Sequence, residues 1–181
     1  MDNRYSPMSL SSRQWFALHV CSRHEKVVDR LLLEKGFETF LPLMVKRSRV
    51  SLGRFREANI PLFPGYVFSC FYPSAEDYYQ VRATTGVVNI VQTNARPAPI
   101  PDGEIESLKK LLAITVEYRI SPSFVPSFVP GQTVIIKEGP LKGIRGEILR
   151  RKNRRLFVIR IALIRRMLEV DLSPLDLEGC F

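Results

Sequence analysis

Short β-forming runs alternate with helical patterns through the first part of the chain. Residues 15–20 and 66–72 are short and rich in aromatic and β-branched side chains, which predicts two buried strands. Between them, four apolar side chains recur at helical spacing over residues 27–32 and predict a helix. Ser22 and Glu25 precede this helix at the spacing of a capping box. We therefore expect Ser22 to cap the helix and Glu25 to reach back to it.

Two weaker patterns follow the first helix. Residues 37–45 are β-like but contain Pro42, which cannot donate to a strand ladder, so we expect an edge strand or a bend there. Residues 46–56 are basic with Gly53 at a turn, which predicts an exposed hairpin or a mobile loop.

The same region contains two more helical patterns and another strand. Residues 74–82 predict a short helix capped by Ser74, and residues 102–113 predict a longer one with a single apolar face. Residues 87–91 predict a strand between them. Residues 13–113 are thus expected to form an α+β domain, an antiparallel sheet flanked by helices.

The C-terminal part of the chain has a different pattern. Residues 114–128 carry prolines and serines without a period, which predicts a flexible, extended linker. Residues 129–178 contain short β-rich runs separated by turn residues, at 134–136, 144–149, 156–161 and 167–170. This spacing predicts a small β-barrel, and its β-branched residues disfavour a helical alternative. Residues 1–12 are polar and aperiodic, so we expect a loose tail.

Charge and composition indicate a partner class. The net charge is +9 and the pI about 9.8, a balance that attracts polyanions. The basic residues cluster at 46–56 and again at 150–155. Three cysteines spaced far apart argue against a disulfide framework. With no long apolar run and a polar N-terminus, the chain is expected in the cytoplasm, without membrane contact.

The sequence shows no catalytic or metal-binding constellation. Cys21 and His24 form a C-x-x-H pair, but no second pair completes a zinc site. Cys21 with His19 or His24 is the one nucleophile–base candidate, and it lacks a third, orienting group. No phosphate-binding loop or dinucleotide fingerprint occurs. We therefore expect no enzymatic activity, no metal and no cofactor.

Several segments together resemble one family along nearly the whole chain. They are Trp15, RHEK at 23–26, FPGYVF at 63–68, VR at 81–82 with TTGV at 84–87, the segment 100–105, GQTV at 131–134, EGPLKG at 138–143, and EVDL at 169–172. In this order they resemble the NusG family, with an N-terminal NGN domain and a C-terminal SH3-like KOW barrel. LFPGYVF at 62–68 and RHEK at 23–26 look most like its specialised paralogues, of the RfaH and UpxY kind.

The resemblance implies a transcription elongation or antitermination factor. Its NGN domain would bind the clamp helices of RNA polymerase and suppress pausing. Aromatic side chains suit such an interface, and Tyr66 and Phe68 lie on one face of their predicted strand. The alternative is that both fill the core. Pro64 and Gly65 are expected mainly to set the turn. The candidate polymerase-binding residues are Phe63, Pro64, Gly65, Tyr66 and Phe68.

Two groups of residues are candidates for binding nucleic acid. The resemblance places the non-template DNA strand of the transcription bubble near the first strand and helix. The candidates there are Arg13, Arg23, His24 and Lys26. The second group is the basic segment, with Lys46, Arg47, Arg49, Arg54 and Arg56, near upstream DNA. For both groups the alternative is a solvated, charged surface.

The barrel is expected to recruit a second partner. The resemblance implies Rho or a small-subunit ribosomal protein, bound at Leu163, Ile164 and Arg165. An alternative function is a ribosome- or RNA-binding KOW protein that grips RNA through the basic residues at 150–155. We expect a monomer.

Overall fold

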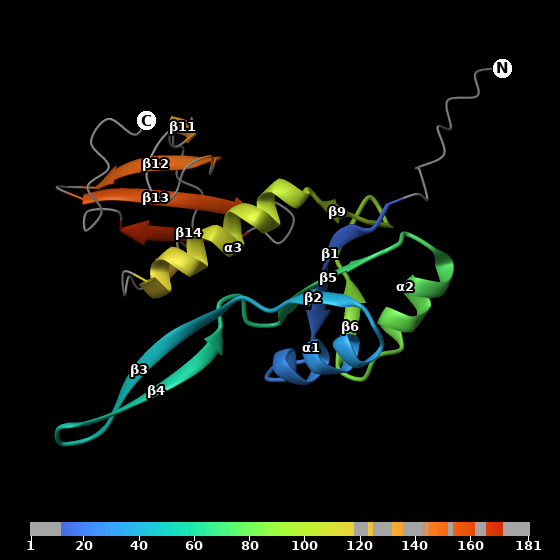
Figure 1. Ribbon diagram of the computed structural model, residues 1–181, viewed down its shortest axis with the longest axis horizontal. Coiled ribbons are helices and arrows are strands. Elements are labelled where there is room, and N and C mark those ends of the chain that lie inside the picture. The colour runs from blue at the N-terminus through green and yellow to red at the C-terminus, as the bar shows by residue number, and fades with distance from the viewer. Residues whose placement is uncertain are drawn as a thin grey trace. The chain divides into compact units, whose positions relative to one another are not determined.

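The computed structural model describes residues 12–117, 123–124, 132–135, 143, 145–151, 154–161 and 166–171 (Figure 1). The chain divides into two compact units. The first combines Met1–Leu41 with Pro64–Asp102, and the second combines Pro42–Phe63 with Gly103–Phe181.

The first unit is built on an antiparallel sheet. Its strands run in the order β2 (Glu38–Phe40), β5 (Tyr66–Phe71), β1 (Gln14–Val20) and β6 (Val87–Ile90), with β9 (Pro99–Ile100) pairing with the start of β1. The helices are α1 (Glu25–Glu34) and α2 (Ala75–Arg82), and a short hairpin joins β7 (Gln92–Thr93) to β8 (Arg96–Pro97). This is the predicted α+β arrangement, with β2 at the sheet edge as expected.

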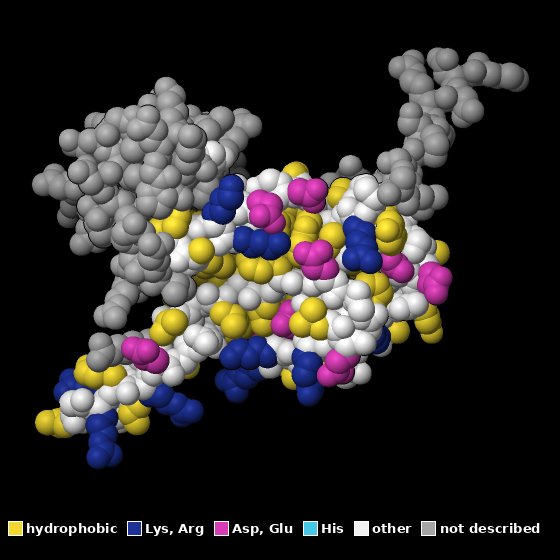
Figure 2. Space-filling view, in the orientation of Figure 1, with side chains coloured by type: hydrophobic (Ala, Val, Ile, Leu, Met, Phe, Trp, Pro, Cys, Tyr) yellow, Lys and Arg dark blue, Asp and Glu magenta, His cyan; other side chains and the backbone are white. Residues whose placement is uncertain are grey.

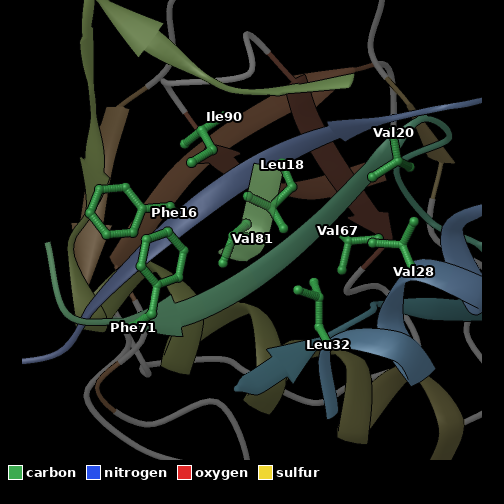
Figure 3. Close-up of a cluster of buried hydrophobic side chains, with 9 residues drawn as sticks. All are labelled: Phe16, Leu18, Val20, Val28, Leu32, Val67, Phe71, Val81 and Ile90. Atoms are coloured by element: carbon green, nitrogen blue, oxygen red, sulfur yellow. The ribbon is translucent and has the colours of Figure 1, made fainter. Parts of the chain in front are cut away.

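Both helices cover one face of the sheet. The buried side chains of this core are Phe16, Leu18, Val20, Val67, Phe71 and Ile90 from the sheet, Val28 and Leu32 from α1, and Val81 from α2 (Figure 3). The Phe16 and Phe71 rings stack with centroids 4.6 Å apart, and Tyr78 meets both edge-on. Burial raises the pKa of the Tyr78 phenol. Val67 and Phe71 are thus the residues of β5 that pack against the helices.

The opposite face of the central strands is buried as well. Trp15, Ala17, Phe68 and Cys70 alternate with the helix-facing residues, and all four are shielded from solvent. The Phe68 ring stacks on Phe40 of the edge strand, with centroids 6.2 Å apart. Strand β5 is thus buried on both sides for most of its length, which is typical of a central core strand.

The start of α1 differs from the prediction. His24 is the N-cap residue, and no side chain caps the helix. Arg23 has a positive φ of 65°, which turns the chain between Ser22 and the helix, so the capping-box prediction is wrong. The Glu25 carboxylate has a tertiary partner instead, described below. At α2 the predicted cap is confirmed, because Ser74 Oγ accepts the Asp77 N–H at 3.1 Å.

In the second unit, residues 43–61 form a two-stranded antiparallel ribbon. Strands β3 (Leu43–Ser51) and β4 (Arg54–Pro61) pair with each other over nearly their whole length. Gly53 turns the chain between them with a φ of +76°. Of the two alternatives for the basic segment, the hairpin is confirmed.

Helix α3 (Asp102–Glu117) is longer than expected. It reaches Glu117 rather than ending near 113. The apolar spacing of Ile105, Leu108 and Leu111 continues to Ile114, which is also buried, and neither glycine nor proline follows before Pro122. The helix therefore takes up the first residues of the expected linker.

The described C-terminal strands form one antiparallel sheet. Its order is β10 (Ser123–Phe124), β14 (Arg166–Asp171), β13 (Arg154–Ile161), β12 (Arg145–Arg151) and β11 (Gln132–Ile135). The four predicted strands are confirmed within two residues at their ends, and β10 adds a short strand inside the expected linker. Closure into a barrel stays a prediction. The tail at 1–11, the expected barrel start at 129–131, and Leu163, Ile164 and Arg165 lie outside the described residues.

Candidate functional site

Three chain segments meet at one end of the sheet in the first unit. They are the β1–α1 loop at residues 21–24, the turn at Pro64 and Gly65, and the turn that ends at Gly86. The Val20 N–H donates to the Gly65 carbonyl at 2.9 Å, and the Cys21 N–H donates to the Gly86 carbonyl at 2.8 Å. The end of β1 therefore holds both glycine turns in place.

A buried carboxylate ties α1 to the turn before β5. Glu25 is 5% exposed, and its Oε1 accepts the Gly65 N–H at 2.8 Å. Gly65 has a φ of +83°, so the turn uses a backbone conformation that other residues adopt with strain. Because Tyr66 follows directly, Glu25 indirectly fixes the position of the first residue of β5.

Replacing Glu25 by alanine is expected to lower the free energy of unfolding by about 1–3 kcal/mol, because the Gly65 N–H loses its charged acceptor. Glu25→Gln keeps an acceptor oxygen, so its free energy of unfolding should fall clearly less than that of Glu25→Ala. Urea unfolding of the intact chain measures both. Glu34→Ala is the control on the same helix, since Glu34 is exposed and its contact to Arg30 is 3.9 Å long. Equal stability of Glu25→Ala and Glu34→Ala would contradict this role.

Gly86 lies against the start of α1 with no room for a side chain. A Cβ atom at this position would be 2.8 Å from Cγ2 of Val28 and 3.3 Å from Cβ of His24. The residue also has a φ of +93°. Both the close approach and the backbone conformation require glycine here.

The side chains presented at this end form what we call the end surface: His19, Arg23, His24, Lys26 and Tyr66. The first four are exposed and Tyr66 is half-buried. His19 lies directly opposite Tyr66 on the neighbouring strand, with ring centroids 5.6 Å apart. The His24 ring is oriented by a contact of 3.1 Å between its Nδ1 and the Ser22 carbonyl. The end surface thus combines cations with planar rings.

Sequence reasoning did not assign His19 to a binding surface. Its one signal was a polar residue next to the end of an apolar strand, since His19 is exposed between the buried Leu18 and Val20. Its pairing with Tyr66 depends on the β1–β5 register, which local sequence patterns do not reveal.

The structure separates Arg13 from the other predicted DNA-binding residues. Arg13 precedes β1, whereas Arg23 and His24 follow its far end. At roughly 3.3 Å per residue, the two ends of this strand are about 20 Å apart. The Arg13 guanidinium lies 5.5 Å from the centroid of the Tyr72 ring, a cation–π contact at the other end of the sheet. The four predicted residues therefore do not form one compact cluster, and their contact with DNA stays a prediction.

The predicted polymerase-binding residues are also divided. Phe63 and Phe68 are fully buried, which for Phe68 favours the alternative that it fills the core. Tyr66 and Gly65 are half-buried and Pro64 is exposed. Of the five predicted polymerase-binding residues, only these three therefore present surface.

The hairpin presents the second group of cations. Lys46, Arg49, Arg54 and Arg56 are exposed, and dark blue side chains project from the hairpin in Figure 2. The Arg47 side chain lies outside the described part of the hairpin. The exposure of the other four fits a binding role but also fits solvated charge.

Comparison with known proteins decides the family. A family model described as "Transcription termination factor nusG" matches residues 13–109. The chain belongs to the NusG family. The NusG of Pseudomonas aeruginosa is 28% identical over 146 residues, covering 76% of this chain and 81% of that protein. The NusG of Buchnera aphidicola is 25% identical over 173 residues, covering 89% and 93%.

A solved structure of Thermotoga maritima NusG shares the fold. It has a TM-score of 0.52 and 20% identity, and the match covers 89% of this chain and 94% of that one. NusG-family proteins are transcription factors that bind RNA polymerase and are not enzymes, so this chain is a non-enzymatic transcription factor of the NusG type. The narrower assignment to the RfaH or UpxY kind stays a prediction.

Two negative findings concern the described part of the chain. No helix there is long and apolar enough to cross a membrane. No group of three or more histidine, cysteine, aspartate or glutamate side chains among the same residues has the geometry to hold a metal ion.

Proposed function

We propose that this protein binds the clamp helices of RNA polymerase through the Tyr66 part of the end surface and suppresses pausing or termination during elongation. The observation that carries the proposal is the half-buried Tyr66, paired with His19 at the rim of a rigid sheet in a NusG-family chain. A tyrosine held in this way offers apolar area and a hydroxyl with little loss of rotamer freedom on binding. A cytoplasmic location, where RNA polymerase works, is part of the proposal.

The cations of the end surface suggest a DNA contact next to that site. Arg23, His24 and Lys26 are exposed at the end of the sheet that also presents Tyr66. Single-stranded DNA is bound by cations on phosphates and planar groups on bases. We assign this role to the non-template strand of the bubble. Arg13, at the other end of β1, is left out of it.

Tyr66→Ala tests the polymerase contact directly. A hot-spot aromatic contributes about 2 kcal/mol or more, so affinity for core RNA polymerase should fall roughly 30-fold. Tyr79→Ala is the matched control, because Tyr79 is exposed on α2 and the same side chain is removed. Binding is measured by titrating labelled protein with core polymerase. Tyr66→Ala and wild type binding equally well would refute the assignment.

We also propose that the C-terminal sheet binds a second partner, either Rho or a small-subunit ribosomal protein. One observation also favours the alternative of an RNA-binding KOW protein. The β12–β13 register places Arg150 opposite Arg155 and Arg151 opposite Arg154. Like charges directly opposite one another repel, and a polyanion would relieve that repulsion. Co-sedimentation with ribosomal RNA in the absence of polymerase binding would favour this alternative.

A further inference from the structure

The tip of the β3–β4 hairpin exposes apolar side chains that the proposed function does not use. We call Val50, Leu52 and Phe55 the hairpin tip. They are 66%, 94% and 53% exposed, respectively. Large apolar side chains this exposed and this close together indicate a binding surface more often than scattered ones do. In Figure 2 the hairpin carries yellow and dark blue side chains next to one another.

The cations around the tip define what can bind there. Residues 43–61 contain five basic residues and one acid, Glu57, a net charge of +4 from five minus one. An acidic partner is therefore favoured. The chain belongs to a family of transcription factors, so nucleic acid is the polyanion that fits its proposed function.

The apolar residues select among forms of nucleic acid. Cations bind the phosphates of paired and unpaired strands alike. Exposed apolar side chains stabilise a complex only when they are buried against another apolar surface. In a duplex the faces of the bases are covered by the neighbouring bases in the stack. Unpaired bases expose them, and aromatic side chains stack on them regardless of sequence.

The register of the hairpin places the two kinds of contact together. Arg49 lies directly opposite Phe55, so a cation and an aromatic ring share one face of the ribbon. Arg56 lies opposite Ser48, and Lys46 opposite Ala58, on the other face. Leu52 and Gly53 form the turn beyond both, so the most exposed apolar side chain is also at the end of the ribbon.

We propose that the hairpin tip contacts unpaired bases at the edge of a DNA bubble, with Leu52 and Phe55 against base faces and the neighbouring arginines on phosphates. This rests on the proposed function for its setting at transcribed DNA, but it uses a different surface from Tyr66. The hairpin therefore distinguishes open from paired DNA, which its cations alone cannot do.

The test compares two DNAs and the full-length chain. One DNA is a duplex with a central unpaired bubble, and the other is the fully paired duplex of the same length. The variant Leu52→Ser with Phe55→Ser keeps every cation, and since both side chains are exposed it should fold as wild type does. We expect wild type to prefer the bubble, and the double variant to bind the bubble about tenfold more weakly with unchanged duplex affinity.

Controls separate this inference from the proposed function. Leu33→Ser removes an exposed leucine of α1 and should leave both affinities unchanged. The double variant should bind core polymerase as well as wild type, while Tyr66→Ala should keep the bubble preference. An equal loss on bubble and duplex, or no loss on either, would overturn the inference. So would binding of the tip to vesicles of anionic phospholipid in preference to bubble DNA.

Discussion

Replacing Phe68 by alanine is expected to lower the free energy of unfolding by about 3–5 kcal/mol. Phe68 is fully buried in the central strand β5, stacks on Phe40 and lies opposite Ala17. Because the ring is fully buried, its truncation removes apolar contacts and leaves a cavity. The loss should appear in urea unfolding monitored by circular dichroism.

The companion variant Phe68→Leu tests whether Phe68 only fills the core or also contacts RNA polymerase. Leucine keeps most of the apolar volume, so stability should fall by less than with alanine, roughly 1–2 kcal/mol. Under conditions where the variant is folded, its affinity for core polymerase should equal that of wild type. If Phe68→Leu loses polymerase binding while remaining folded, Phe68 contacts the partner directly, and our division between Phe68 and Tyr66 is wrong.

Gly86→Ala should be almost as damaging, with an expected loss of about 2–5 kcal/mol. Two effects add. A residue with a Cβ atom at a left-handed φ is strained by roughly 1–2 kcal/mol. The new methyl group would also lie 2.8 Å from Cγ2 of Val28, and overpacking of this kind typically adds about 1–3 kcal/mol.

The chain provides controls that separate the two effects. Gly53 has a φ of +76°, and no atom lies within 4 Å of the position that a Cβ atom would take there, so Gly53→Ala should show the strain alone. Gly65 has a φ of +83° and its nearest neighbours are 3.9 Å away, so Gly65→Ala should resemble Gly53→Ala. Thermal melts rank the three variants. If Gly86→Ala and Gly53→Ala lose the same amount, the start of α1 moves aside and the packing argument fails.

Local signals were enough to predict most of the elements in the first unit. The cap of α2 was predictable because Ser74 and the Asp77 N–H that it accepts are only three residues apart. Such a contact forms within the helix end and depends on no distant segment. The alternation along β5 predicted that Tyr66 and Phe68 share one face of the strand, and the structure places Val67 and Phe71 on the other face, against the helices. The β-like run at 37–45 breaks at Pro42 into β2 and β3, and β2 is an edge strand, as the proline in this run predicted.

Local signals failed where a distant residue competes for the same group. Ser22 and Glu25 have the spacing of a capping box, yet the Glu25 carboxylate accepts a hydrogen bond from Gly65, 40 positions away. The Glu25 carboxylate is buried next to the Gly65 N–H, and a buried carboxylate needs a hydrogen-bond donor. A motif of four residues carries no information about that donor.

The candidate site likewise has parts that the sequence showed and parts that only the structure showed. The types of side chain were evident from the chain itself: aromatic residues after a Pro-Gly turn, cations beside the first helix, and a basic segment with a glycine at its turn. Only the tertiary structure showed that Phe68 is buried while Tyr66 is half-buried, and only it brought His19 beside Tyr66. Periodicity records which neighbours share a face, because the backbone repeats every two or 3.6 residues. Depth of burial and spatial proximity depend on strand register and on contacts between distant segments, which no local pattern contains.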